Sequence, residues 1–433
     1  MICEACQTLK HNRERYLAPR TTASLVNMLS NLAENWLEPE YPFRKLALES
    51  GMAATGFSRA TLAAGLDGLF RQLTREGINA LLEQDLGHAR RLDDLVASPT
   101  EQKGGRAALV TAPELLVHFT AGNIPNPAII SIILGILARS AQFVKCATGA
   151  SFLSRLFAHS LYEIEPKLGA CLEVAEWRGG NAPLEQALFE ETDCVTATGS
   201  DETLAAIRPR LKPTTRFLGY GHRVSFGLVM AGALAGGGGR KLVERAATDV
   251  IAWDQLGCLS PHLIYVEEGG AWSAELFAEK LAEELTKREI QQPRGALSVE
   301  MAATIASRRS FYEMRAASSP DTRMWRSPDS TAWTVVYEAA PLFQLSCLHR
   351  FIYVKGVKDL SDALQGADKF RGKVSTVGLA APEEQIPALA AQLARWGVTR
   401  VCPLGQMQSP PLTWHHDGRP ALGDLVTWTD WES

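Results

Sequence analysis

The sequence lacks the long apolar run that a membrane-spanning helix requires. A bilayer span takes about 18 or more consecutive apolar residues, whereas the longest apolar run, Pro127 to Ala138, stops at Arg139. We therefore predict a buried helix there and no membrane span. The opening segment, MICEACQTLKHNRERY, contains charged side chains where a secretory signal has an unbroken apolar core, so we expect a cytoplasmic protein.

The sequence also contains few cysteines and no excess of basic residues over acidic ones. Eight cysteines are spread over 433 residues, too thinly for a disulfide framework. Cys3 and Cys6 form a C-x-x-C with no second pair after it, which favours a loosely ordered terminal pair over a zinc site. The 44 basic and 48 acidic side chains give a net charge of -4, which argues against a nucleic-acid-binding protein.

What the chain does contain is typical of a globular protein with helices and strands in alternation. At roughly 150 residues per domain, 433 residues indicate two or three domains. From Ala23 to about Leu95 apolar residues recur at three- and four-residue spacing, which predicts helices. The segment EQKGGRAAL, residues 101–109, is predicted to be a polar hairpin or loop.

After that segment, short apolar runs alternate with helical stretches, which predicts a parallel, doubly wound sheet. The predicted strands are Leu115–Phe119, Gln142–Cys146, Leu172–Glu176, Cys194–Ala197, Arg216–Tyr220, Leu263–Val266, Thr334–Tyr337, Phe351–Val354 and Thr376–Leu379. Ligands of such sheets bind beyond the carboxyl ends of the strands. The residues that follow each strand are therefore the first candidates for a site.

Two candidates follow the first two strands. Asn123 lies in the turn FTAGNIPNP, and its amide can donate to a carbonyl oxygen that gains charge during acyl transfer. The alternative is that Asn123 only forms the turn. Lys145, in FVKCAT, can meet a ribose hydroxyl or a phosphate, or it is simply a solvated strand-end lysine.

Glycine-rich segments give weaker indications. In TATGSDET, Gly199 and Ser200 follow a strand where a turn into a helix can meet a phosphate, although the segment is not a full G-x-G-x-x-G. The run GGGG, residues 236–239, lacks the context of a phosphate loop and is interpreted as a flexible approach to a helix.

Cys258 has the most unusual position of the cysteines. An amphipathic helix from Lys241 is predicted to stop at Gly257, and Cys258 follows at once, before Pro261. Because the helix dipole at that end disfavours a thiolate, a reactive Cys258 would need amide donors or a histidine, for which His222 and His262 are candidates. The alternative is a buried structural cysteine.

Near the end of the chain, WHHDGRP places His415 and His416 side by side. Neighbouring side chains on an extended chain point in opposite directions, so we expect no shared metal and predict a packed loop that borders a pocket.

Taken in order, AGNIP, VKCAT, TATGS, GYGHRVSF, LGCLSPH and CPLGQMQSPPLTWHHDGRP resemble the long-chain acyl reductase family of the LuxC type, which belongs to the aldehyde dehydrogenase superfamily. The resemblance runs from about residue 110 to the end. It implies an aldehyde-dehydrogenase-like α/β fold with a Rossmann-type cofactor domain and an α/β catalytic domain. The domain boundaries that we expect are 1–110 for a helical section, 111–225 for NADP binding, 226–405 for catalysis and 406–433 for a segment that returns to the active-site region.

The resemblance also assigns roles to individual residues. Cys258 falls on the acylated nucleophile of the family and Asn123 on the oxyanion-hole asparagine of the superfamily. Lys145 falls on the lysine that contacts the ribose, and Gly199 and Ser200 fall on the turn beside the cofactor. Leu204 departs from the pattern, because a second glycine is usual there.

Two further departures from ordinary aldehyde dehydrogenases carry physical meaning. Where those enzymes have a glutamate that activates water, GYGHRVSF has His222, so an acyl-enzyme is hydrolysed slowly and can accept hydride. Where many NAD-using relatives carry a glutamate three residues after the lysine, this chain has Thr148. A carboxylate would repel a 2′-phosphate and a hydroxyl would not, which predicts NADPH as the cofactor.

The sequence therefore predicts an enzyme that reduces a fatty acyl thioester, from an acyl-CoA or acyl-protein donor, to an aldehyde with NADPH. An acyl-protein synthetase is a possible partner in the family, and a homo-oligomer is expected. The alternatives are an aldehyde dehydrogenase that works in the oxidative direction and a non-redox subunit that holds acyl groups. The absent glutamate disfavours the first, and the combination of Cys258, Asn123 and Lys145 disfavours the second.

Overall fold

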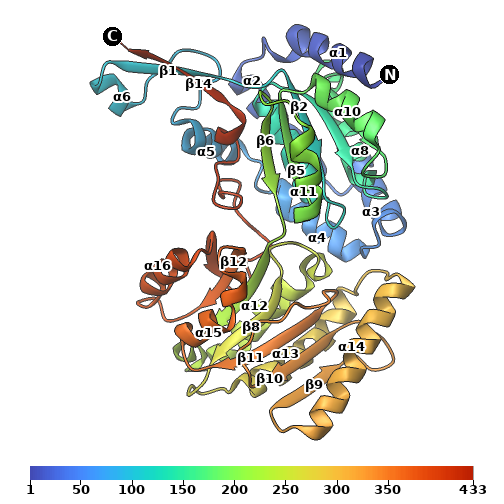
Figure 1. The fold of residues 1–433 in the computed structure, drawn as a ribbon, viewed down its shortest axis with the longest axis vertical. Helices are drawn as coiled ribbons and strands as arrows, with labels where there is room; N and C mark the ends of the chain where they lie inside the picture. The colour runs from blue at the N-terminus through green and yellow to red at the C-terminus, as the bar shows by residue number, and fades with distance from the viewer. Residues whose placement is uncertain (433) are drawn as a thin grey trace. The chain divides into compact units, whose positions relative to one another are not determined.

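A five-stranded parallel sheet forms the centre of the first of two units into which residues 1–432 divide in this computed structural model (Figure 1). The first unit contains residues 1–55, 66–222 and 411–432, and the second contains residues 56–65 and 223–410. In the first unit the strand order is β4-β3-β2-β5-β6. These strands are β2 Leu115–Phe119, β3 Ala141–Cys146, β4 Leu172–Glu176, β5 Cys194–Thr198 and β6 Arg216–Tyr220.

Helices connect the parallel strands and cover the sheet, because a parallel pair needs a crossover connection. They are α7 Asn126–Leu137, α8 Phe152–Ile164, α9 Pro166–Gly169, α10 Ala182–Glu191, α11 Asp201–Ile207 and the short η2 Arg208–Arg210. All residues of β2 and β3 are buried, as expected for strands with packing on both faces.

The remaining part of the first unit is the helical N-terminal section and a two-stranded sheet. The helices are α1 Ile2–Asn12, η1 Arg13–Leu17, α2 Thr22–Leu37, α3 Pro42–Thr55, α4 Arg59–Phe70, α5 Arg75–Leu86, α6 Pro99–Lys103 and η6 Gly423–Leu425, with the start of α4 belonging to the second unit. The antiparallel strands are β1 Arg106–Thr111 and β14 Thr427–Glu432. All six residues of β14 are exposed.

The second unit is built on a seven-stranded sheet of order β13-β12-β7-β8-β11-β10-β9, parallel except for β9. Its strands are β7 Val224–Val229, β8 Pro261–Glu267, β9 Thr322–Arg326, β10 Thr334–Glu338, β11 Phe351–Val357, β12 Val374–Ala380 and β13 Arg400–Pro403. Its helices are η3 Ala231–Leu234, α12 Gly238–Ile251, η4 Ala252–Gln255, α13 Ala274–Gln291, α14 Val299–Ser318, α15 Leu360–Gly366, η5 Asp368–Phe370 and α16 Ile386–Trp396.

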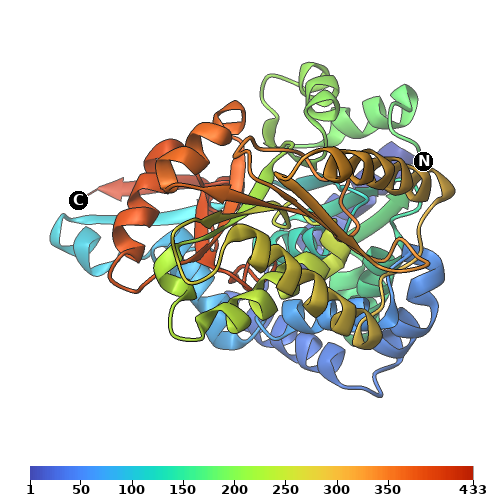
Figure 2. The same cartoon turned by 90° about the horizontal axis from the view of Figure 1, so that it is seen from below.

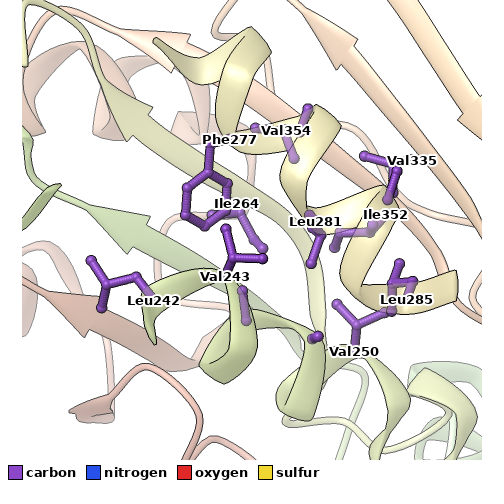
Figure 3. Close-up of a cluster of buried hydrophobic side chains, with 14 of the residues drawn as sticks. Leu242, Val243, Val250, Ile264, Phe277, Leu281, Leu285, Val335, Ile352 and Val354 are labelled. Atoms are coloured by element: carbon purple, nitrogen blue, oxygen red, sulfur yellow. The ribbon is translucent and has the colours of Figure 1, made fainter. Parts of the chain in front are cut away.

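Two apolar clusters hold helices to the two faces of this sheet. Figures 1 and 2 show these helices beside the sheet. One face packs against α12 and α13, and the other packs against α14, α15 and α16. Each fully buried aliphatic side chain contributes roughly 1.5–3 kcal/mol. Figure 3 shows the first cluster, with Leu242, Val243, Val250, Phe277, Leu281 and Leu285 from the helices and Ile264, Val335, Ile352 and Val354 from the strands.

Of the helices in residues 1–432, none has both the length and the apolar composition required to span a bilayer. The run that we predicted as a buried helix is α7, in which most residues are buried. The predicted α/β fold class, the helical front section and all nine predicted strands are confirmed, with ends that differ by a few residues at most.

Three local predictions were wrong, and the strand β7 was not predicted. Residues 101–109 are not a hairpin or loop, because a capping box between Ser98 and Glu101 starts α6 and β1 follows it. In GYGHRVSF the buried strand β7 was missed, since its polar start hides it. The helix before Cys258 ends at Ile251 rather than at Gly257. Cys3 and Cys6 lie in α1, where Cys6 is buried, and are not loosely ordered.

Candidate active site

The turn after β2 places Asn123 at the carboxyl end of the first sheet. Asn123 is exposed and precedes α7, which starts at Asn126. A Cβ on Gly122 would lie 3.1 Å from the Cβ of Ala147, so this turn packs closely on the turn that follows β3. The two turns that carry Asn123 and Thr148 are therefore neighbours.

Lys145 lies near the end of β3 and is only 7% exposed. Its Nζ lies 5.9 Å from the ring centroids of both Phe119 and Trp177. Burial lowers the pKa of this lysine, while the negative charges of Glu185 and Glu176 oppose the shift. Desolvation makes a charged group attract an anion or a hydroxyl more strongly than it would in water. Thr148, three residues later, is exposed.

Glu176 is a functional candidate that the sequence reasoning missed. It is the last residue of β4, and its Oε1 accepts a hydrogen bond of 2.8 Å from the N–H of Gly149, the residue after Thr148. This backbone hydrogen bond and then the Ser151 hydroxyl lower the pKa of Glu176, so the carboxylate stays charged. The strand-end rule that found Lys145 would have found Glu176 as well.

A cavity of about 250 Å³ lies beside this carboxylate. The residues that line it come from the turn before α8, from α8 itself and from the end of β4: Gly149, Ser151, Phe152, Arg155, Leu156, His159 and Glu176. The side chains of Arg155, His159 and Glu176 therefore line one cavity next to the turn that contains Thr148.

The turn after β5 contains Gly199 and Ser200. The N–H of Gly199 donates to the carbonyl oxygen of Tyr220 over 3.1 Å, and the Ser200 hydroxyl caps α11 by accepting from the N–H of Thr203 over 3.3 Å. Ser200 thus stands at a helix start beyond a strand end. Because the Gly199 N–H already donates to Tyr220, we expect Gly199 to serve a ligand by its lack of a side chain, which lets the ligand approach the backbone closely.

His222 also belongs to the first unit, just beyond β6. It is exposed, and its backbone N–H donates to Asp201 Oδ1 over 3.0 Å. The C-terminal segment packs nearby, since the His416 ring stacks on the Tyr220 ring with centroids 4.4 Å apart. Asn123, Lys145, Thr148, Gly199, Ser200 and His222 thus all lie in or after the ends of strands of one sheet.

Cys258 lies in the second unit, in the turn between η4 and β8. Its side chain is exposed. The Ser225 hydroxyl of β7 donates to the Cys258 carbonyl oxygen over 2.9 Å, which fixes the backbone under the thiol. A Cβ on Gly257 would lie 2.3 Å from Gln408 Nε2, so only glycine allows the Gln408 side chain to approach this closely.

The other cysteines differ in their exposure and their ionisation. Cys3 is also exposed, whereas the remaining cysteines are buried or half-buried. Burial raises the pKa of Cys6, Cys171 and Cys194 to about 12, that of Cys347 and Cys402 to about 11, and that of Cys146 above its usual value. A thiol with a pKa near 11 or 12 is almost never a thiolate at neutral pH, so these cysteines are inert.

Of the two histidines considered as assistants to Cys258, only His262 shares its unit. His262 lies on β8 and is 9% exposed. Its Nδ1 accepts a hydrogen bond of 3.1 Å from the N–H of Ser346, which leaves the proton of a neutral ring on Nε2.

The order of helices and strands along the chain, with one parallel sheet and one mostly parallel sheet, gives an aldehyde-dehydrogenase-like fold. Solved structures agree. The NAD-dependent benzaldehyde dehydrogenase from Corynebacterium glutamicum aligns with a TM-score of 0.72 and 14% identity over 100% of this chain and 90% of its own. Bifunctional proline utilization A aligns with a TM-score of 0.74 and 15% identity over 99% of this chain, which spans 44% of that larger protein.

The particular family follows from the sequence. Residues 17–428 match the acyl-CoA reductase (LuxC) family, and the chain belongs to it. The long-chain acyl-protein thioester reductase of Aliivibrio fischeri is 23% identical over 94% of this chain and 82% of its own length. The protein is thus an oxidoreductase that acts on acyl groups.

Proposed function

We propose that this protein reduces a fatty acyl thioester to an aldehyde with NADPH, through an acyl group held on Cys258. One observation carries the proposal: Cys258 is exposed in a fixed backbone turn, while every other cysteine except Cys3 is withdrawn from solvent to some degree. Because the thiolate is the nucleophile, an accessible thiol is the first requirement.

In the acyl-transfer step, the Cys258 sulfur attacks the carbonyl carbon of the donor thioester. A new carbon–sulfur bond forms to Cys258, the bond to the donor sulfur breaks, and the donor leaves as a thiolate that takes up a proton. The carbonyl oxygen gains negative charge on the way, and we assign its stabilisation to the side-chain amide of Asn123.

The acyl group must then survive until it is reduced. No carboxylate stands in GYGHRVSF to activate water, and the exposed His222 occupies that place. Slow hydrolysis favours reduction over release of a fatty acid. When bound, NADPH would supply the hydride that the acyl carbon accepts, so that one thioester, one NADPH and one proton would give an aldehyde, a thiol and NADP⁺.

The residues at the sheet edge fit a nicotinamide dinucleotide. The Lys145 ammonium is nearly buried against two aromatic rings and is suited to a ribose hydroxyl or a phosphate. Thr148, Gly199 and Ser200 are exposed or half-exposed beyond the ends of β3 and β5, on either side of β2 in the same sheet. We assign NADPH rather than NADH because Thr148 is neutral and lies close to Lys145 in sequence.

The donor, the partners and the location belong to the same proposal. An acyl-protein or acyl-CoA is the expected donor, because the curated relatives are named acyl-protein thioester reductases. We expect an acyl-protein synthetase as a partner and the cytoplasm as the location. A homo-oligomer is supported by β14, whose six residues are exposed and include Trp428 and Trp431.

The test is NADPH consumption with a series of acyl-CoAs, together with trapping of the product. The expected result is one aldehyde formed for each NADPH consumed. Aldehyde oxidation without any acyl-CoA reduction would instead identify an oxidative aldehyde dehydrogenase. Acylation without NADPH consumption would identify a subunit that only holds acyl groups.

A further inference from the structure

Two short segments of the second unit have a backbone conformation that non-glycine residues rarely adopt. Trp253, Asp254 and Gln255 have φ values of 51°, 50° and 67°, and residues 348–350 have φ values of 63°, 55° and 66°. In this left-handed region the Cβ is crowded, and a run of such residues persists only where surrounding contacts hold it. The first segment stands immediately before the turn that carries Cys258.

A buried ion pair joins the two left-handed segments. Arg350 Nε donates to Asp254 Oδ1 over 2.9 Å, and Arg350 Nη2 lies 2.7 Å from the same oxygen. The two side chains are only 1% and 4% exposed. The other carboxylate oxygen, Asp254 Oδ2, accepts from the N–H of Gly295 over 3.0 Å. Both carboxylate oxygens of Asp254 are thus held in place, Oδ1 by the Arg350 guanidinium and Oδ2 by the N–H of Gly295.

Arg350 is in turn anchored to the end of α13. Its Nη1 donates to Glu289 Oε2 over 2.8 Å and to the carbonyl oxygen of Gln292 over 2.9 Å. The guanidinium therefore connects three segments of chain: η4, the end of α13 and the start of β11. A planar group with five donors suits this task, and a lysine could not reproduce it.

Gln255 closes the Cys258 turn from the inside. It is fully buried, and its Nε2 donates to the carbonyl oxygens of Pro261 over 2.7 Å and Phe351 over 3.1 Å. Because Pro261 begins β8, this amide ties the start of the turn to its end. The conformation of residues 253–255 thus sets the direction in which the Cys258 turn leaves the core.

We propose that the Asp254–Arg350 ion pair is a positioning device for Cys258. This inference rests on the proposed role of Cys258 as nucleophile. Neither residue of the pair needs to touch the substrate. The pair holds the left-handed segment in place, and the segment fixes the backbone that presents the thiol. A misplacement of about 1 Å at a reacting group can cost on the order of a hundredfold in rate.

The chain contains a matched control pair. Lys355 Nζ of β11 lies 3.0 Å from Glu338 Oε2 of β10, with side chains 1% and 2% exposed. It is as buried as the Asp254–Arg350 pair and lies in the same unit. It adjoins neither left-handed segment. Removal of the charge of one partner in either pair leaves the other charge buried and uncompensated, which destabilises the unit.

The experiment compares Asp254→Leu, Asp254→Asn and Glu338→Gln with the wild-type chain. The readouts are the thermal midpoint, the rate at which iodoacetamide alkylates Cys258 across a range of pH, and the single-turnover rate of Cys258 acylation by an acyl-CoA. We expect all three variants to lower the thermal midpoint. Only the Asp254 variants should change alkylation and acylation, by tenfold or more for Asp254→Leu.

Asp254→Asn keeps an oxygen that can accept from Arg350, so its rates should fall between those of the wild type and Asp254→Leu. If Asp254→Leu does not fold, the inference is tested by comparing the Cys258 alkylation and acylation rates of Asp254→Asn with those of Glu338→Gln. Cys258 rates within twofold of Glu338→Gln in the folded Asp254 variants would overturn the inference. A wild-type chain that is alkylated at Cys258 but never acylated there would instead overturn the proposed function.

Discussion

The two units hold their candidate reactive groups in different ways. In the first unit Lys145 lies near the end of a regular parallel strand, and Thr148 and Ser200 follow such strands, so the sheet itself brings them to one edge. In the second unit Cys258 stands on an irregular turn that depends on a buried ion pair and on left-handed backbone. Substitutions at the first site should therefore act locally, whereas the second site should also respond to changes in the core.

The largest expected effect is that of Cys258→Ala, which should abolish aldehyde formation because no other cysteine can take its place. Product analysis by gas chromatography is the measurement. Cys146→Ala and Cys402→Ala serve as controls and should keep the activity if they fold, since burial raises the pKa of both thiols. Full activity in Cys258→Ala would contradict the proposed acyl-cysteine mechanism.

The second-largest effect is expected for Asn123→Ala, in the first unit. Removal of one oxyanion donor costs on the order of 10²–10³ in turnover. We expect such a loss with little change in cofactor affinity, measured by steady-state kinetics and by titration of NADPH fluorescence. A fall of less than about tenfold in a folded variant would show that Asn123 only forms the turn.

A smaller effect is expected for cofactor choice. A carboxylate placed a few ångströms from a 2′-phosphate costs roughly 1–4 kcal/mol, and about 1.4 kcal/mol is a factor of ten. Thr148→Glu should therefore shift the ratio of kcat/KM values toward NADH by about tenfold or more. The wild type should prefer NADPH, and an unchanged ratio in the variant would mean that Thr148 does not face the ribose.

The charged Glu176 sharpens this comparison, because it lies beside the same turn. If its carboxylate weakens the binding of a 2′-phosphate, Glu176→Gln should raise the preference for NADPH by about tenfold or less. The matched substitution Glu173→Gln, on the same strand but away from its end, should leave the ratio unchanged. Equal shifts in both variants would point to a general charge effect.

The two units should also differ in how their stability depends on pH. Burial lowers the pKa of His118 in β2 to about 4, so the first unit loses stability as the pH falls from about 6.5 through 4. Burial raises the pKa of Asp249 in α12 to about 7, so the second unit loses stability as the pH rises from about 4 through 7. Hydrogen exchange in each unit is the measurement, and Asp249→Asn should flatten the trend in the second unit alone.

Much of the fold could be predicted because parallel strands buried on both faces appear as apolar runs. The nine predicted strands were found in this way, and the strand-end rule then selected Lys145 and Gly199. The rule could equally have selected Glu176, but a single acidic residue at the end of a strand that mixes polar and apolar residues gives little signal.

The environment of Cys258 could not be predicted from local pattern. The periodicity of α12 continues in sequence to Gly257, yet the helix ends at Ile251 because Asp254 turns away to meet Arg350, 96 residues later. Left-handed φ values at Trp253 and Gln255 have no sequence signal, since neither residue is a glycine or an asparagine. Contacts between distant segments decide this part of the structure.

The most direct measurement is mass spectrometry of the chain after incubation with an acyl-CoA, first without and then with NADPH. The account predicts a single acyl adduct on the peptide that contains Cys258, followed by its disappearance as an equal amount of aldehyde forms. An adduct on another residue, or an adduct on Cys258 that persists with NADPH while no aldehyde appears, would contradict it.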